Sequence, residues 1–461
     1  MSNTAEEQFN SSDRPHVVMV TNHGMHEWKV DAGLPDTGGQ NVYVNQLSAT
    51  LRKLGFRVTI YNRGGYPHPK SGRPRSGTHY RNGEERLTYL EDSRSEFIRK
   101  EEMFPRIGEL AEDLARRLRS APEPVLVVSH YWDGAAVTDQ ALERLGLSLP
   151  HVWIPHSLGA LKREGTPKEE WSELRLQERI STEEELLRRV SLIGATSQAM
   201  RRTLAEAHGV TEALFLPPCV DEQRFNLQAA RDESALGLLS EATGLSEREV
   251  REARIITEVS RTDRTKRKDV LIEAFARVHR KHPEALLAVT IDPGAGELYR
   301  ELTALISERS LSGRVATLGS IWEYLPSLYG MTAVYCTPSI MEGFGMSIQE
   351  AAACGAPAVA TRRVPFAVEY LRGSGGETRP VGEGHETIEI GEGALLVPSE
   401  SVAATAVALE LLLSDDSMRR RMGRRAHEIT IPRFTWETMT REFLAEAGIP
   451  IPKEGEPGNG S

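Results

Sequence analysis

Two glutamate residues separated by seven positions form the first set of side chains that could do chemistry. Glu342 and Glu350 enclose the segment Gly-Phe-Gly-Met-Ser-Ile-Gln. If a loop carries Glu342 and a helix begins near Met346, both carboxylates can accept hydrogen bonds from one sugar or ribose diol. Gly343 and Gly345 let a ligand approach the backbone, and the helix N-terminus offers amide donors to an anion. Two solvated glutamates on a strand–loop–helix connection would show the same spacing.

A second set combines cations with the end of an expected strand. Arg261 and Lys266 follow the apolar segment 254–259 and precede a helical pattern in residues 270–275. Cations at the carboxyl end of a strand, beside a helix N-terminus, are typical of a phosphate site. A solvated charged loop is the alternative, and the other cations within residues 264–268 favour it.

Two shorter sets lie in the first half of the chain. Gly39 and Gln40 belong to a Gly-Gly turn at the start of an expected helix, where backbone N–H groups can face a phosphate or a sugar hydroxyl. This turn is not the pattern Gly-x-Gly-x-x-Gly, which argues against a dinucleotide-dependent dehydrogenase. His156 follows another expected strand and can hydrogen-bond a substrate, although a histidine packed under a loop fits equally well.

Alternating strands and helices must position these side chains. Apolar, β-branched runs predict buried parallel strands, and the helical spacing of residues 43–54 and 107–118 predicts helices between them. The expected strands cover residues 16–21, 57–61, 125–128, 151–154, 254–259, 286–291, 334–336 and 358–360. This order predicts an α/β protein with two doubly wound, Rossmann-like domains, and a ligand at the carboxyl ends of their strands, in the cleft between the domains.

The domain boundaries follow from changes in composition. We expect an N-terminal domain over residues 15–225 and a C-terminal domain over residues 226–430, then a helix within 431–449 that packs back towards the N-terminal domain. Residues 1–14 and 450–461 are expected to be disordered tails. The Gly-, Pro- and Arg-rich segment 64–86 suggests a mobile surface loop, and residues 373–393 suggest an insertion.

The composition narrows the class of protein. The chain has 461 residues, a formal net charge of −10 and three cysteines far apart in sequence. The acidic balance argues against bulk binding to nucleic acid, and the cysteines offer neither a disulfide framework nor a metal-ligand spacing. No apolar run is long enough to cross a membrane, and the N-terminus does not resemble a signal peptide. We therefore expect a cytoplasmic multidomain enzyme with no nucleic-acid or membrane partner.

The four sets occur together in the order typical of one enzyme family. Thr37–Gln40, Pro155–Gly159, Ser260–Lys266 and Glu342–Glu350 resemble the corresponding motifs of the family 4 retaining glycosyltransferases, which have the GT-B fold. Within that family the sequence is most similar to the sucrose-phosphate synthase and mannosylfructose-phosphate synthase group. The resemblance runs from about residue 16 to residue 443.

The resemblance implies roles for individual residues. The C-terminal domain would bind a nucleotide-sugar, with UDP-glucose favoured, and the acceptor would be a phosphorylated small molecule such as fructose 6-phosphate. The residues implied in the catalytic step are His156, Arg261, Lys266 and Glu342. Those implied in donor binding are Gly39, Gln40, Gly343, Phe344, Gly345 and Glu350. Those implied in binding the acceptor phosphate are Lys100, Lys162 and Arg179.

The family also implies a mechanism without a resident cofactor. Retaining transfer would use no protein nucleophile, and the chain contains no Asp-x-Asp triplet for holding a donor through a metal ion. We therefore expect metal-independent transfer, with the two domains closing on their substrates and a sugar-phosphate phosphatase acting downstream. Residues 361–370 replace the usual Gly-Gly-Pro turn with extra cations and Phe366, which leaves the donor base and sugar open.

Three alternatives remain at this point. One is a GDP-mannose-, ADP-glucose- or GDP-glucose-dependent synthase that acts on a phosphoglycerate or another sugar phosphate to make a compatible solute. Another is a transferase with a neutral or lipid-linked acceptor, which should carry a basic amphipathic helix that we do not find in the sequence. The third is a non-catalytic protein that binds nucleotide-sugars.

Overall fold

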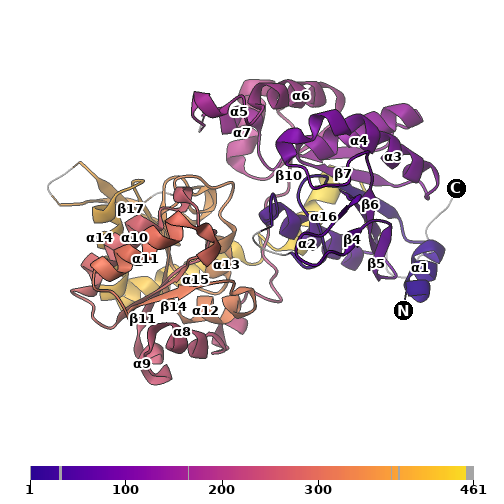
Figure 1. The fold of residues 1–461 in the computed structure, drawn as a ribbon. Helices are drawn as coiled ribbons and strands as arrows, with labels where there is room; N and C mark the ends of the chain where they lie inside the picture. The colour runs from indigo at the N-terminus through magenta and orange to yellow at the C-terminus, as the bar shows by residue number, and fades with distance from the viewer. Residues whose placement is uncertain (1, 31–33, 165, 375, 383–384, 453–461) are drawn as a thin grey trace. The chain divides into compact units, whose positions relative to one another are not determined.

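The computed structural model describes residues 2–30, 34–164, 166–374, 376–382 and 385–452, and Figure 1 shows its ribbon. The chain divides into two compact units. Unit 1 holds the residues up to Pro217 and those from Trp436 onwards, and unit 2 is Pro218–Thr435. The first boundary therefore lies earlier than the expected 225/226, and the second lies later than the expected 430/431.

Unit 1 is built on a sheet with the strand order β10-β9-β8-β7-β1-β2-β6-β5. Every neighbouring pair is parallel except β5 and β6. Its strands are β1 (His16–Val20), β2 (Arg57–Arg63), β5 (Thr78–Asn82), β6 (Glu85–Leu90), β7 (Leu126–His130), β8 (His151–Ile154), β9 (Leu192–Ala195) and β10 (Leu214–Phe215). The central strands are buried along their whole length, as expected for β-branched runs covered by helices on both faces.

Most helices of unit 1 lie between these strands in the chain, and the longer ones bury an apolar stripe. They are α1 (Ser2–Ser11), α2 (Gly39–Lys53), α3 (Ile107–Arg119), α4 (Tyr131–Leu145), α5 (Gly159–Glu164), α6 (Leu176–Arg189), α7 (Gln198–His208) and α16 (Trp436–Glu446), with short 3-10 turns at Lys100–Glu102, Phe104–Arg106 and Lys168–Glu170. Helix α16, yellow in Figure 1, lies beside α2 and β10 although it is far from both in sequence.

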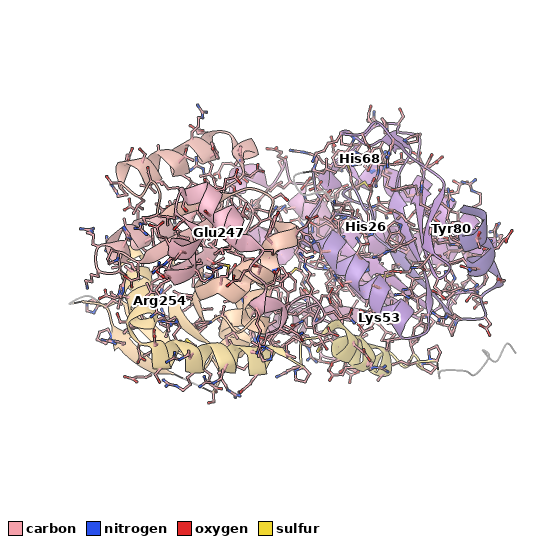
Figure 2. The ribbon with its side chains drawn as sticks, turned by 90° about the horizontal axis from the view of Figure 1, so that it is seen from below. His26, Lys53, His68, Tyr80, Glu247 and Arg254 are labelled. Carbon is pink, nitrogen blue, oxygen red and sulfur yellow. The ribbon has the colours of Figure 1, made fainter. Side chains whose placement is uncertain are left out.

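Two segments of unit 1 are ordered where we expected disorder or mobility. Residues 2–11 form α1, because Phe9 is buried and contacts the ring of Tyr80 in β5, which Figure 2 labels beside that helix. Residues 64–86 form β5, the start of β6 and a small ribbon, β3 (Tyr66–Pro67) with β4 (Pro74–Arg75). The ribbon is held by Arg75, a fully buried guanidinium that donates to Asn62 at 2.6 Å.

Unit 2 repeats the architecture with the strand order β13-β12-β11-β14-β15-β18-β17-β16. Its strands are β11 (Arg254–Glu258), β12 (Ala285–Thr290), β13 (Val315–Leu318), β14 (Thr332–Thr337), β15 (Ala358–Thr361), β16 (Glu377–Pro380), β17 (Thr387–Ile390) and β18 (Ala394–Val397). The neighbouring strands in the series β13-β12-β11-β14-β15-β18 are parallel. At one edge of the sheet, β17 pairs antiparallel with β18, and β16 pairs antiparallel with β17. Within the segment 373–393, the described strands β16 and β17 thus extend the sheet as an antiparallel pair.

Helices cover both faces of this second sheet. They are α8 (Ala235–Thr243), α9 (Glu247–Glu252), α10 (Lys268–His279), α11 (Glu297–Glu308), α12 (Leu325–Met331), α13 (Met346–Ala353), α14 (Val402–Ser414) and α15 (Asp416–Thr430). The shorter turns are Ala229–Arg231, Arg264–Lys266, Pro293–Ala295, Trp322–Tyr324 and a π-helical turn at Ala367–Leu371. Figure 2 labels Glu247, where α9 begins, and Arg254, where β11 begins.

Both sheets agree with the predicted fold class, and the eight predicted strands are confirmed with bounds shifted by at most a few residues. The expected disordered segment 450–461 lies outside the described residues from 453 onwards. Within the residues that the structure describes, no helix combines the length and apolar character needed to cross a membrane.

Candidate functional site

In unit 2, one residue from each of the first two sets meets the other in an ion pair. Lys266 lies in the turn after β11, and its Nζ is 2.6 Å from Oε1 of Glu342. Two hydrogen bonds hold this turn in place, because the Ile340 N–H and the Ser339 hydroxyl both donate to the carbonyl of Thr265. Both side chains are largely shielded from solvent, so each charge is compensated by the other. The second carboxylate oxygen of Glu342 stays available to a ligand.

Arg261 lies on the same loop but does not join that ion pair. Its side chain is 82% exposed, and its nearest carboxylate is Asp263 at 3.8 Å. Beneath the loop, Lys268 forms a buried ion pair with Glu258 and donates to the Ser260 hydroxyl at 2.9 Å. The loop that carries Arg261 is therefore anchored, while the guanidinium itself is free to reach an anion.

Glu350 lies one turn into α13, as the sequence predicted for a helix beginning at Met346. The hydroxyl of Tyr329 donates to its Oε2 at 3.4 Å. Burial raises the pKa of the Glu350 carboxyl from 4.5 to about 7, against the opposing effects of Arg224 and of the Tyr329 hydroxyl. The carboxyl group changes from a mixed donor and acceptor to an acceptor only as it loses its proton near neutral pH, so its hydrogen bonding to ribose hydroxyls is sensitive to pH.

The residues of the glycine-rich segment between the two glutamates have different structural roles. Gly345 has φ 104° and caps α13, and a Cβ there would lie 2.8 Å from Val364. Gly343 faces open space, which leaves its backbone accessible to a ligand. The side chain of Phe344 is buried against Phe366, so the role in donor binding that we expect of this residue involves its backbone. Phe366 is likewise a core residue.

In unit 1, the Gly-Gly turn begins α2 at the carboxyl end of β1. Gly38 is the N-cap, and its N–H donates to the Asn41 side chain at 2.9 Å. Gly39 is the first helical residue, and the Gln40 amide donates to the hydroxyl of Thr21 at 3.0 Å. The helix N-terminus thus carries amide donors next to the end of the central strand.

His156 follows β8 and has a left-handed backbone, with φ 58°. Its Nε2 lies 3.0 Å from Nδ1 of His130, the last residue of β7, and its ring packs edge-on against Tyr43. Burial lowers the pKa of His156 to about 3. The imidazole is therefore neutral at physiological pH and can act as a hydrogen-bond partner but not as a cation.

The two expected lysines of unit 1 differ in their surroundings. Lys100 forms an ion pair with Asp36 and lies 3.3 Å from Glu101. Burial alone would lower the pKa of Lys100, but its hydrogen bond and attraction to Asp36 outweigh burial and raise it. Lys162 in α5 has only a distant carboxylate, Glu101 at 3.9 Å. Burial, and then repulsion from Lys100, lower the pKa of Lys162.

Arg179, expected to help bind the acceptor phosphate, is buried and already bonded on several sides. Its role towards the acceptor stays a prediction. Its Nε donates to Glu183 at 2.7 Å, Nη1 to the Tyr131 hydroxyl at 2.5 Å, and Nη2 to the carbonyl and hydroxyl of Ser157. With five N–H groups in total, the side chain has at most one to spare. Arg179 therefore mainly fixes Tyr131 and the segment next to His156.

These three cations nevertheless line one small pocket of unit 1. Tyr131 forms part of its wall and has a left-handed backbone, with φ 63°. The lining residues are Lys100, Glu101, Phe104, Tyr131, Trp132, Lys162, Leu174 and Arg179. Cations that converge beside an aromatic wall favour the binding of an anionic group.

Several residues of the site were missed by sequence reasoning. These residues act on the expected ones. Asp36, Tyr131 and His130 in unit 1 and Tyr329 in unit 2 do so by direct contact, and Arg224 acts on Glu350 through its charge. His130 and Tyr131 lie in the segment Ser129–Gly134, which also resembles a segment of the sucrose-phosphate synthase group, so the sequence held a signal for them. The others depend on contacts between residues distant in sequence, which spacing alone does not reveal.

Comparison with known families assigns both units. The family described as Glycosyltransferase Family 4 matches residues 37–224, and the family described as Glycosyl transferases group 1 matches residues 245–429. These two ranges contain all the expected site residues of units 1 and 2 respectively. The chain belongs to the glycosyltransferases of this two-domain, GT-B type, and it is an enzyme of the hexosyltransferase class.

Individual relatives indicate which kinds of glycosyltransferase the chain is similar to. The chain is 28% identical to a mannosylfructose-phosphate synthase of Agrobacterium fabrum, over 75% of this chain and 76% of the relative. It is also 28% identical to a D-inositol 3-phosphate glycosyltransferase of Corynebacterium jeikeium, over 92% and 95% of the two chains. The solved sucrose-phosphate synthase of Thermosynechococcus elongatus shares the fold with a TM-score of 0.73 at 23% identity, over 94% of this chain and 98% of that one.

Proposed function

We propose that the protein transfers a hexosyl group, with retention, from a nucleotide-sugar to a phosphorylated small acceptor. UDP-glucose and fructose 6-phosphate are the first candidates. The observation that carries this proposal is the pocket of unit 1, where Lys100 and Lys162 converge with Arg179 behind them. A dianionic phosphate ester needs such cations, and a protein with a net charge of −10 must supply them locally.

The names of the relatives support a phosphorylated acceptor without selecting one. The names mannosylfructose-phosphate synthase, D-inositol 3-phosphate glycosyltransferase and sucrose-phosphate synthase all include a phosphorylated compound. D-inositol 3-phosphate is therefore a second acceptor candidate beside fructose 6-phosphate. A GDP-mannose-, ADP-glucose- or GDP-glucose-dependent reaction with a phosphoglycerate-type acceptor would use the same cations.

The donor would bind to unit 2. Arg261 and Lys266 would neutralise the diphosphate as it leaves, Glu342 would accept hydrogen bonds from the sugar hydroxyls, and Glu350 would accept those of the ribose. The exposed guanidinium of Arg261 and the accessible backbone at Gly343 fit these roles. Each donor aimed at the developing charge is typically worth roughly 3–4 kcal/mol in the transition state.

The chemical step would need no protein nucleophile. The acceptor hydroxyl would attack the anomeric carbon on the face from which the diphosphate departs, and a leaving-group oxygen would take the hydroxyl proton. The protein would then contribute position and charge. His156, neutral because of its burial, would hold the donor sugar by a hydrogen bond.

A donor-by-acceptor screen tests this proposal. UDP-, GDP- and ADP-sugars are each combined with fructose 6-phosphate, D-inositol 3-phosphate, 3-phosphoglycerate and glucosyl-3-phosphoglycerate, and with the unphosphorylated sugars. Nucleotide release is followed with EDTA present and absent. We expect turnover only with a phosphorylated acceptor, and equal rates with EDTA. Turnover restricted to neutral acceptors would refute the acceptor assignment, and loss of turnover in EDTA would refute the metal-independent mechanism.

Substitutions in unit 2 test the donor assignment separately. We expect Glu342→Ala and Arg261→Ala each to reduce kcat about a hundredfold or more without unfolding the protein. Arg264→Ala is the matched control, because Arg264 lies on the same loop but is paired with Glu301. Near-normal rates in either variant would show that the residue has been misassigned.

A further inference from the structure

Two histidine rings meet side by side at the carboxyl ends of neighbouring parallel strands. His130 ends β7, and His156 lies two residues beyond Ile154, the last residue of β8, which pairs with His130. The ring planes are inclined by 27°, with centroids 5.2 Å apart, and Nδ1 of His130 lies 3.0 Å from Nε2 of His156. This distance requires a hydrogen bond, so one of the two nitrogens carries a proton and the other accepts it.

Neither ring is charged at neutral pH. Burial lowers the pKa of His156 to about 3, and burial together with nearby histidines lowers the pKa of His130 well below its ordinary value. Each imidazole therefore carries one proton, on one of its two nitrogens. The direction of the hydrogen bond between them then decides the tautomer of both rings.

The outer nitrogen of His130 indicates that direction. Its Nε2 is buried and has no hydrogen-bond partner among the described residues. If His130 accepted from His156, its own proton would lie on this Nε2 as a buried donor without an acceptor, which is rare in folded proteins. If His130 donates through Nδ1–H, its Nε2 is only an unused acceptor, which is tolerated more often.

We propose that His130 is a positioning residue, whose Nδ1–H donates to Nε2 of His156 and thereby places the His156 proton on Nδ1. His156 then presents an N–H donor to its ligand, and it recognises an acceptor atom such as a sugar oxygen. This inference rests on the proposed function only in identifying that ligand as a sugar. The same contact holds the ring while the backbone of His156 remains in the strained left-handed region.

The tautomer can be measured without any assay of activity. The protein is labelled with 15N-histidine, and long-range 15N–1H correlation spectra are recorded at neutral pH, with His156→Gln and His130→Asn used to assign the two rings. We expect the protonated nitrogen of His156 to be Nδ1 and its Nε2 to show the shift of an acceptor. A proton on Nε2 of His156 would overturn the inference, whether or not the protein is an active transferase.

Two substitutions of His130 separate positioning from simple packing. Asparagine keeps an N–H donor at the place of imidazole Nδ1, whereas leucine fills space without a donor. We expect His130→Leu to lower kcat about tenfold to a hundredfold, and His130→Asn to recover most of that loss with His156 still protonated on Nδ1. His151→Gln is the control, because His151 is a buried histidine at the opposite end of β8.

The outcomes distinguish this inference from the proposed function. If His130→Asn and His130→Leu are equally impaired, or if leucine is harmless, His130 does not position His156. If the wild-type tautomer is the expected one but no nucleotide-sugar is consumed with any acceptor, the proposed function fails while the assignment of the proton stands.

Discussion

At the scale of single residues, the acceptor site depends on how each cation is already paired. Lys100 is neutralised by Asp36, and Arg179 is bonded to Tyr131, Ser157 and Glu183. Lys162 is the exception, since its nearest carboxylate is 3.9 Å away and its pKa is lowered by burial and by Lys100. An incoming phosphate would stabilise the charged form of Lys162 more than that of the other two.

We therefore expect Lys162→Ala to raise the KM for a phosphorylated acceptor about tenfold to a hundredfold, because a charge-assisted hydrogen bond to phosphate is worth roughly 1.5–3 kcal/mol. The KM for the nucleotide-sugar should stay the same. Steady-state kinetics with each substrate varied in turn measure both effects. Lys168→Ala, at an exposed lysine shortly after α5, is the control and should change neither value. A larger change in the donor KM than in the acceptor KM would contradict this assignment.

A second residue-scale prediction concerns Glu350 and pH. Its pKa is about 7 in the folded protein, against 4.5 as the ordinary value that we take for the unfolded chain. Between these two values the folded state binds more protons than the unfolded state, so the free energy of unfolding falls as pH rises from about 4.5 to 7. Glu350→Gln should remove this loss, which is on the order of 1–3 kcal/mol above pH 7.

Urea unfolding at a series of pH values measures the effect as the difference between Glu350→Gln and the wild type. That difference should grow from pH 5 to pH 7 and then level off. Glu308→Gln, at an exposed carboxylate of the same unit, should show no such trend. A variant that loses stability above pH 7 would mean that the Glu350 carboxylate is well compensated in the folded protein.

At the scale of elements, sequence patterns were sufficient where a strand or helix buries a continuous apolar run. The strand at His151–Ile154 and the helix beginning at Ile107 were predicted at their observed starting points because burial on both sides demands such runs. Sequence patterns did not predict the structure where a single polar side chain stabilises a segment. Arg75 orders a Gly- and Pro-rich segment by donating to Asn62, and Arg179 donates to Tyr131 and Ser157, which are well separated from it in sequence.

Helix α1 illustrates the same limit and yields a prediction. Its sequence is polar, and a helix of this length is marginal in water by itself, so packing must stabilise it. Phe9 supplies that packing, since it is 1% exposed and the Arg57 guanidinium donates to its carbonyl. We expect Phe9→Ala to cost about 3 kcal/mol of stability and to increase hydrogen exchange in α1 and β5. Glu6→Ala, at an exposed position of the helix, should do neither.

At the scale of the whole molecule, the chain leaves unit 1 at Pro217 and returns to it at Trp436. Unit 2 is therefore continuous in sequence, whereas unit 1 needs its last helix from the far end of the chain. Helix α16 buries Trp436, Met439, Phe443 and Leu444 at helical spacing within unit 1, and the ring of Trp436 contacts that of Tyr43 at 4.9 Å. Tyr43 also contacts His156, so the last helix supports the candidate site indirectly.

This arrangement predicts that damage to α16 affects the two units unequally. Phe443 is fully buried, and Phe443→Ala should destabilise unit 1 by about 3–5 kcal/mol while leaving the affinity of unit 2 for a nucleoside diphosphate unchanged. Calorimetric binding of UDP, GDP and ADP reports on unit 2, and hydrogen exchange of β1, β7 and β8 reports on unit 1. Glu446→Ala, at an exposed position at the end of the same helix, is the control. Faster exchange in β11 and β14, or weaker nucleotide binding, would show that the stability of unit 2 also depends on α16, contrary to a division in which each sheet and its helices form their own core.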